Sequence, residues 1–251
     1  LVLPTFQGSV ERVYPFVKRS GQKKGILKNI NMQYNFRGEN RITTTDSLFL
    51  KKEMFDDAKY GMRHSIPIST NFKVLKHLSV SMNGNYEEVW TGSTIKRNDY
   101  DSETGNSGNK VEIKGFDRFS QYNFGMGVGT TIYGLFNFKK ESKIEALRHV
   151  IRPSINYSIR PSFDEYYDTY IIDANGNTAE YTRSEDNFFG LPSRTYSSSI
   201  GLQVSNNLEA KVRSKDSLAQ ESKKITILNN LNFSTSYNLA SDSLKLSPVR
   251  M

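Results

Sequence analysis

The chain contains no cysteine among its 251 residues, so a disulfide framework and any site built on a thiolate are excluded. It also lacks any run of roughly 18 consecutive apolar residues, the length that a membrane-spanning helix needs. A helical membrane protein is therefore excluded. Histidine occurs only at His64, His77 and His149, and the spacing indicates no serine or acidic partner for them, so we expect no enzyme and no cofactor.

The charge of the chain is strongly positive, with a formal net charge of +8. Basic chains often bind nucleic acid or anionic lipid. Here lysine and arginine are spread along the whole sequence and no nucleic-acid motif accompanies them, so we expect no nucleic-acid partner. Hydrophobic residues make up 36% of the chain, which is typical of a soluble protein. A membrane β-barrel, in which every second residue is apolar, gives a similar average, so hydrophobic content does not separate the two classes.

The segment QYNFGMGVGTTIYGLFNF, residues 121–138, alternates with a period of two. Its even positions carry Tyr122, Phe124, Met126, Val128, Thr130, Ile132, Phe136 and Phe138, and its odd positions are mostly glycine or polar. Globular strands cluster near about five or six residues, so this strand is unusually long. Its aromatic residues lie at both ends, as expected where a strand crosses a bilayer and rings settle at the two interfaces.

A second long strand is predicted in RHVIRPSINYSIRPSF, residues 148–163, where Pro153 and Pro161 share the parity of the apolar residues. Each proline removes one ladder donor, which normally confines it to an edge strand. Along an antiparallel strand, residues of one parity form their backbone hydrogen bonds with the same neighbouring strand. Both prolines therefore remove amide donors from the contact with one neighbour, which we call the seam. We expect this seam to be weak at its two ends.

Five further segments alternate in the same way, at 30–36, 62–72, 78–86, 196–212 and 227–239. A tight turn is predicted at 74–76 and modest connections at 139–147 and 213–223, whereas long polar loops are predicted at 38–60, 91–118 and 164–195. Short turns on one side and long loops on the other are typical of outer-membrane barrels. Within the last loop, IIDANGNTAEY predicts a small hairpin that turns at Asn175 and Gly176.

The pattern predicts an all-β fold, a transmembrane antiparallel β-barrel. Closed bacterial barrels have an even number of strands, roughly eight or more, and the seven strands predicted here are too few. LKLSPVRM also resembles the start of another strand, and the chain begins with leucine without a signal peptide. We therefore expect residues 1–251 to be a partial barrel domain, with about seven or eight strands of a larger, processed or partial protein. A soluble β-sandwich or surface adhesin remains open, because alternation alone does not separate lipid from core.

Several separated segments resemble one known family. RHVIRPSINYSIRPSF, NNLEAKV, KKITILNNLNFSTSYNLASDSLKLSP, GENRITTTDSLF and HSIPISTNFK are similar to the barrel of the lipopolysaccharide-assembly protein family LptD, in a divergent branch. The resemblance extends over most of residues 8–249 and involves no catalytic motif.

The resemblance implies a transport role in the bacterial outer membrane. Family members form a very large barrel that receives lipopolysaccharide from a periplasmic bridge of Lpt components and releases it through the lumen and a lateral opening into the outer leaflet. It also implies contact with outer-membrane lipids and an LptE-like lipoprotein plug. The chain departs from the family in lacking the periplasmic jelly-roll domain and the cysteines that tie this domain to the barrel in other branches. A porin-like channel or a nutrient transporter is the alternative within the same fold class.

The polar faces of the predicted strands supply the candidate site. The lumen-facing candidates for substrate contact are Arg63, Lys73, Gln121, Asn123, Arg152, Asn156, Arg160, Gln203 and Lys211. Glu87 and Glu209 are the acidic residues predicted on the same faces. Such a basic, hydrogen-bonding wall suits anionic sugar phosphates. The alternative is that some of these residues lie near the periplasmic rim and contact water.

An acidic cluster, NDYDSETGNSGN, resembles half of a calcium-binding loop through Asp99, Asp101 and Glu103. Its glycine at position 105 comes one residue late for an EF-hand, and the terminal glutamate is missing. We therefore expect a solvated loop without a metal.

Overall fold

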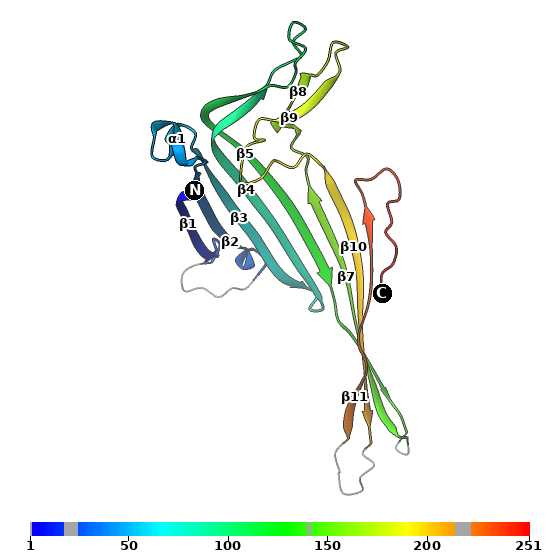
Figure 1. The fold of residues 1–251 in the computed structure, drawn as a ribbon. Coiled ribbons are helices and arrows are strands. Elements are labelled where there is room, and N and C mark those ends of the chain that lie inside the picture. Colours follow the sequence, from blue (N-terminus) through cyan, green and yellow to red (C-terminus); the bar gives the residue numbers. More distant parts are fainter. Residues whose placement is uncertain (1, 18–24, 140–141, 214–221) are drawn as a thin grey trace. The chain divides into compact units, whose positions relative to one another are not determined.

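The computed structural model describes residues 2–17, 25–139, 142–213 and 222–251. Among them, nine antiparallel strands form one sheet with the order β1-β2-β3-β4-β5-β7-β10-β11, and β6 pairs with β7 (Figure 1). The strands of this sheet are β1 (Val2–Val13), β2 (Asn31–Arg41), β3 (Lys59–Val74), β4 (Leu78–Arg97), β5 (Lys110–Gly129), β6 (Ile132–Asn137), β7 (Ile144–Arg160), β10 (Ser197–Val212) and β11 (Lys223–Asn238). The predicted all-β, antiparallel architecture is confirmed.

Helical structure is confined to the connections. The connection between β2 and β3 contains a short 3-10 turn, Asp46–Leu48, and the five-residue helix α1, Lys52–Asp56. Two further 3-10 turns lie at Leu27–Asn29 and Asp164–Tyr166. No helix in the described ranges is long and apolar enough to cross a membrane.

The chain divides into two compact units. Unit 1 contains residues 1–69, 83–124 and 160–196, and unit 2 contains residues 70–82, 125–159 and 197–251. Unit 1 therefore holds β1 and β2 with the adjoining parts of β3, β4 and β5, and unit 2 holds β6, β10 and β11 with most of β7.

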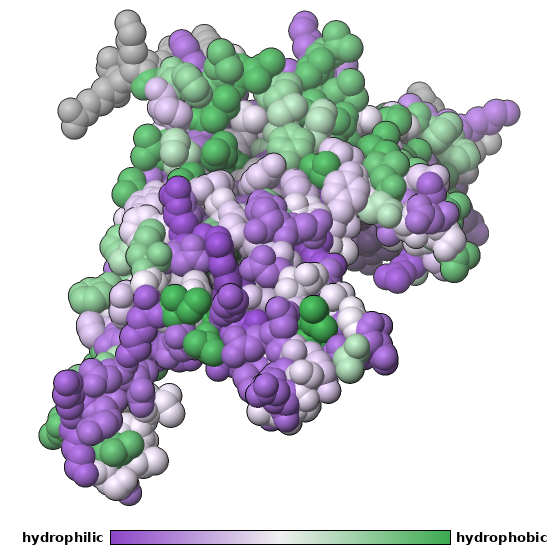
Figure 2. Space-filling model, turned by 90° about the horizontal axis from the view of Figure 1, so that it is seen from above, coloured by the Kyte–Doolittle hydropathy of each residue, from purple (hydrophilic) through white to green (hydrophobic). Residues whose placement is uncertain are grey.

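Strand register places the two parities on opposite faces of the sheet. In β2 and β3, Met32 lies opposite Ile68 and Phe36 opposite His64, whereas Asn31 lies opposite Ser69 and Arg37 opposite Arg63. Neighbouring strands thus combine their apolar residues on one face and their polar residues on the other. We call these the apolar face and the polar face. Figure 2 shows hydrophobic residues gathered along one side of the view and hydrophilic residues over much of the rest.

The apolar face leaves large side chains exposed. Phe6, Ile68, Phe116, Phe136 and Ile155 are each at least 43% exposed. Exposed apolar surface on this scale marks a face that contacts something other than water. It disfavours the β-sandwich alternative, in which this face would be covered by a second sheet.

The sequence pattern missed strand β1 and placed several loop boundaries wrongly. Proline at position 4 and glycine at position 8 interrupt the apolar alternation in Val2–Val13, yet this segment pairs with β2 along most of its length.

Because the neighbouring strands are longer than predicted, the connections predicted at 38–60 and 91–118 span 42–58 and 98–109. The predicted tight turn lies at 75–77, where Leu75 and Lys76 have positive φ angles, as in a type I′ hairpin. The connections predicted at 139–147 and 213–223 lie partly outside the described residues.

The connection predicted at 164–195 contains the two-stranded sheet of β8 (Tyr167–Ile171) and β9 (Thr178–Thr182). Its turn is the one predicted from IIDANGNTAEY: Gly176 has a φ of 81°, and the Asp173 carboxylate accepts hydrogen bonds from the backbone of Asn175 and Asn177. The small hairpin is therefore confirmed.

The single long strand predicted at 121–138 is interrupted at residues 130–131, between β5 and β6. Thr130 lies opposite Pro153: its amide donates to the Pro153 carbonyl at 3.1 Å, but proline has no amide to return the bond. The break in the ladder therefore coincides with the missing donor. Pro161 lies just beyond the end of β7 at Arg160, so it removes no donor from a regular part of that strand.

Candidate functional site

The polar face of unit 1 carries a connected network. Arg63 of β3 donates to Glu87 of β4 at 2.6 Å, and Gln121 of β5 donates to the other carboxylate oxygen of Glu87 at 3.1 Å. Glu87, which the sequence predicts on the same face, thus joins two of the predicted site residues, Arg63 and Gln121. The side-chain oxygen of Gln121 accepts in turn from the backbone amide of Ser193, at 3.1 Å.

A second group of charges lies on β2. Glu39 is buried, with 5% of its surface exposed, and it forms ion pairs with Arg37 and Arg41. A buried carboxylate is costly unless it is paired and hydrogen-bonded. The two arginines therefore supply the charged partners that a buried carboxylate needs at this position.

Residues 183–195, which follow β9, lie across the polar face of unit 1, and we call them the covering segment. The amide of Ile95 donates to the carbonyl of Arg183 at 3.0 Å, which attaches the start of the segment to β4. Ser193, near its other end, bonds to Gln121 of β5 and accepts from the amide of Phe163 at 2.9 Å. The covering segment is thus attached at both ends.

Two carboxylates attach the middle of the covering segment. Glu185 accepts from Arg97 at 2.6 and 3.1 Å. Asp186 accepts from Lys59 at 3.0 Å and from Lys110 at 2.6 Å. Cations from β3, β4 and β5 therefore converge on two consecutive acidic residues of one loop.

These contacts change the pKa of both carboxyls. Hydrogen bonds from Arg97 are the largest influence on Glu185 and hold its pKa below the ordinary value. For Asp186 the largest influence is burial, which raises the pKa, but the combined hydrogen bonds and charges of Lys110 and Lys59 outweigh it, and the net shift is downward. Both groups are therefore charged at neutral pH.

Apolar contacts accompany the ion pairs. Val89, Ile95 and Phe119 have the parity of the polar face, yet each is at most 2% exposed. Phe119 packs against Tyr166 with ring centroids 5.9 Å apart, and Pro192 of the covering segment is fully buried. The guanidinium of Arg41 lies 4.3 Å from the ring centre of Phe188. The polar face of unit 1 thus contains a small core, which the sequence analysis missed.

A hollow on the polar face of unit 2 brings together three other predicted residues. Lys73, Arg152 and Gln203 line a cavity of about 510 Å³ with Lys76 and His77. Its remaining polar lining consists of Ser79, Thr130, Thr131, Ser154 and Ser205. Within the described part of the chain, Lys73, Lys76 and Arg152 have no carboxylate partner. We call this cavity the cationic hollow.

The other predicted residues lie elsewhere. Asn156 lines a neighbouring cavity with Lys73. Lys211 forms an ion pair with Glu145 at 3.1 Å, and Glu209 pairs with Arg148 at 3.5 Å. Asn123 and Arg160 are exposed in unit 1 and join neither the network nor the hollow.

The acidic loop at 98–109 uses its carboxylates to close turns. Asp101 accepts from the amide of Glu103 and the hydroxyl of Thr104, and Asp99 accepts from the amide of Ile171 on β8. Across the described ranges, no group of three or more histidine or acidic side chains is arranged to hold a metal ion.

A single antiparallel sheet with one exposed apolar face and one hydrogen-bonded polar face is the arrangement expected for part of a membrane β-barrel protein. A family model described as LptD protein matches residues 1–251. The chain therefore belongs to the LptD protein family, and the resemblance seen in its sequence is confirmed. LptD proteins are β-barrel proteins of lipopolysaccharide transport in the outer membrane. No curated protein and no solved structure matches the chain significantly.

Proposed function

We propose that this chain is part of an outer-membrane translocon that inserts lipopolysaccharide into the outer leaflet, and that the polar face lines the path of its sugars and phosphates. The cationic hollow is the observation that carries this proposal. It combines cations from β3, from the 75–77 turn and from β7 with the amide of Gln203 on β10. Three cations that have no carboxylate partner among the described residues are suited to phosphate, which accepts several charge-assisted hydrogen bonds.

The position of the hollow supports the direction of transport. It adjoins the tight turn at 75–77, and short turns of outer-membrane barrels lie on the periplasmic side. A phosphate arriving from the periplasm would meet Lys73, Lys76 and Arg152 first. The hydroxyl groups around the cations would form hydrogen bonds with the sugars, in place of some of those that the sugars make with water.

The proposed partners follow from the same function. A periplasmic bridge would deliver the lipid, and an LptE-like lipoprotein would plug the lumen of the complete barrel. In this arrangement the covering segment occupies the polar face at the long-loop end of the strands. It would narrow the path on the extracellular side.

The test replaces Lys73, Lys76 and Arg152 with glutamine in the full-length protein in cells. Loss of the charge-assisted bonds should slow the appearance of lipopolysaccharide at the cell surface while barrel abundance stays normal. Loss of even one such bond, with a contribution of about 1.5–3 kcal/mol, should weaken phosphate binding by about 10- to 100-fold. The matched control replaces Arg12, Lys28 and Lys96, three exposed cations outside the hollow.

Normal surface lipopolysaccharide in the triple variant, at normal abundance, would contradict the proposal. A porin-like channel or nutrient transporter predicts a different result: unchanged surface lipid together with altered ion or solute conductance of the purified protein. The two measurements on the same variant therefore separate the two functions.

A further inference from the structure

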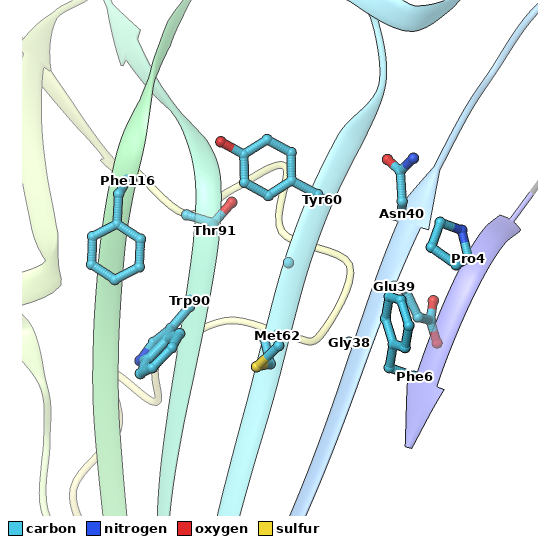
Figure 3. A pocket seen from close by; sticks show the side chains of 11 residues that line it. Pro4, Phe6, Gly38, Glu39, Asn40, Tyr60, Met62, Trp90, Thr91 and Phe116 are labelled. Carbon is cyan, nitrogen blue, oxygen red and sulfur yellow. The ribbon is translucent and has the colours of Figure 1, made fainter. Parts of the chain in front are cut away.

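The apolar face of unit 1 is hollowed by a groove with a volume of about 240 Å³. Figure 3 shows the side chains around it, which extend from β1, β2, β3, β4 and β5. The large apolar side chains that line it are Phe6, Tyr60, Met62, Trp90 and Phe116. Such a lining accepts hydrocarbon and offers little to a polar ligand.

Gly92 leaves room for the aromatic ring of Tyr60 to lie against the sheet. A Cβ atom at Gly92 would come within 2.1 Å of the Tyr60 ring, so this ring covers the bare backbone of β4. Trp90 and Phe116 meet edge to face with ring centroids 5.7 Å apart. The groove is therefore bounded by aromatic side chains held by neighbouring strands.

Charged groups of the apolar face lie directly beside this groove. Glu88 accepts hydrogen bonds from Trp90 Nε1 at 2.6 Å, from the Tyr86 hydroxyl at 2.7 Å and from Arg118 at 3.0 Å. The Arg118 side chain is 66% exposed, whereas that of Glu88 is 15% exposed. Arginine has five N–H donors, so Arg118 keeps donors for another partner.

A histidine extends the polar cluster. The ring of His64 lies between those of Tyr34 and Trp90, with centroid distances of 5.9 and 4.3 Å, and its Nδ1 atom pairs with the Tyr34 hydroxyl at 2.7 Å. His64 is 9% exposed, and its Nε2 atom has no hydrogen-bond partner among the described residues. Ionisable residues are rare and costly on a membrane face and commonly mark a functional site.

The groove lies toward the long connections of the sheet. Asn40 and Tyr60, which line it, are the second residues from the strand ends that flank the connection 42–58. Long connections of outer-membrane barrels are extracellular, and aromatic residues gather at the membrane interface. The groove and the charges beside it thus fall where acyl chains of the outer leaflet meet their headgroups.

We propose that the groove and the polar cluster of Tyr34, His64, Tyr86, Glu88, Trp90 and Arg118 bind one lipopolysaccharide molecule of the outer leaflet on the outside of the barrel. An acyl chain lies in the groove, and a phosphate of the headgroup binds Arg118. Glu88 holds the guanidinium in place, and the aromatic rings exclude water from the contact. The proposal rests on the outer-membrane location of the proposed function but not on transport through the lumen.

The experiment measures lipid retained by the full-length protein. The protein is extracted in mild detergent, purified, and incubated with lipopolysaccharide or with phosphatidylglycerol, and bound lipid is counted by native mass spectrometry. Wild-type protein should retain lipopolysaccharide in preference to phosphatidylglycerol. Arg118→Gln and Phe116→Ala should each weaken retention about tenfold, since each removes one half of the site.

Two controls address folding and position. Phe136→Ala removes an aromatic side chain of the apolar face that is 61% exposed, close to the 67% of Phe116, but outside the groove, and it should leave retention unchanged. Arg118→Lys keeps the charge and should restore part of the retention. Unshifted mobility in unheated gel electrophoresis would confirm that each barrel is folded.

Equal retention by Arg118→Gln, Phe116→Ala and wild type would overturn the proposal, as would equal retention of the two lipids. These outcomes are independent of the cationic hollow, because lipid retention outside the barrel and arrival of lipopolysaccharide at the cell surface are measured separately. Failure of this site would therefore leave the proposed function standing, and failure of transport through the lumen would leave this site standing.

Discussion

At the scale of single residues, the alternation of the sequence predicts which face a side chain lies on. It does not fully predict how much a substitution there destabilises the protein. Gly127 has the parity of the polar face, where a serine would be expected to be harmless. In the structure a Cβ atom at Gly127 would lie 2.8 Å from both Asn156 Oδ1 and Ser81 Oγ. The sequence predicts the face but not the neighbour that fills the space above it, because that neighbour comes from another strand.

Asn123 and Phe124 provide a cleaner test of the two faces, since they are consecutive residues of β5 at similar depth and both are exposed. Arginine facing lipid near the bilayer midplane costs about 2–4 kcal/mol. We expect Phe124→Arg to lower the free energy of unfolding of the full-length barrel by about this amount. Asn123→Arg, on the polar face, should cost less than half as much.

The measurement is urea unfolding of the barrel in phospholipid vesicles, followed by tryptophan fluorescence. Phe124→Ala serves as the control for loss of the ring alone. Similar costs for the two arginine variants would show that the apolar face does not contact lipid.

At the scale of strands, Pro153 and Pro161 differ in their effect on the ladder, since only Pro153 lies within β7. Pro153 lies opposite Thr130, and the Thr130 carbonyl receives no amide from it, whereas Pro161 lies beyond the end of the strand. The sequence predicts that both prolines withdraw donors from one seam; the structure shows the ladder interrupted opposite Pro153 only, and the weakening itself stays a prediction. The sequence did not predict where β7 would end, since strand ends depend on the connections that follow them.

We therefore expect Pro153→Ala to stabilise the junction between β5 and β6. The new amide would donate to the Thr130 carbonyl, a bond with a net contribution of about 0.5–1.5 kcal/mol. Hydrogen exchange should slow at the amides of residues 130–132. Pro161→Ala is the matched control and should leave these amides unchanged; faster or equal exchange in Pro153→Ala would refute the assignment.

The covering segment gives a prediction about pH. A carboxylate whose pKa is lower in the folded than in the unfolded state contributes stability in full above its unfolded pKa, and this contribution is lost as pH falls through the folded pKa. The ordinary values are 4.5 for Glu185 and 3.8 for Asp186, and both are lowered here. Attachment of the segment should therefore be constant from neutral pH to about 4.5 and weaken below these values.

Hydrogen exchange within residues 184–190, corrected for the intrinsic effect of pH, measures this attachment. Asp186→Asn should raise exchange several-fold already at neutral pH, because Lys59 and Lys110 lose their common charged partner. Protection that persists unchanged well below pH 3.8 would show that apolar contacts alone hold the segment.

At the scale of the whole molecule, the sequence predicted the fold class and most strands, because alternation depends only on neighbouring residues. It also placed Arg63, Gln121 and Glu87 on one face, where the structure joins them. The covering segment lies within the long polar loop predicted at 164–195, and its attachment to the sheet was not predicted, since its contacts join residues far apart in the chain. A signal was nevertheless present: Val89, Ile95 and Phe119 are apolar residues at polar positions, and each lies buried.

If the polar face lines the lumen, detaching the covering segment should widen the path through the complete barrel. We expect the double variant Glu185→Gln, Asp186→Asn of the full-length protein to show several-fold higher conductance in planar bilayers at neutral pH. Glu165→Gln combined with Asp168→Asn makes the same charge change in the same connection and should behave like wild type. Equal conductance of all three proteins would argue that the segment lies outside the path.

The hairpin of β8 and β9 leads into the covering segment, and this has an immunological consequence. Its turn at 172–177 is closed by Asp173, with the backbone bond from Ile172 to Asn177 at 2.8 Å, and it carries exposed polar residues. If the long connections face the outside of the cell, as the proposed function requires, this turn would be accessible to antibodies on intact bacteria. Pro192, a few residues further along, is fully buried and Phe188 is half-buried, so serum raised against residues 183–195 should recognise the denatured protein more strongly than living cells.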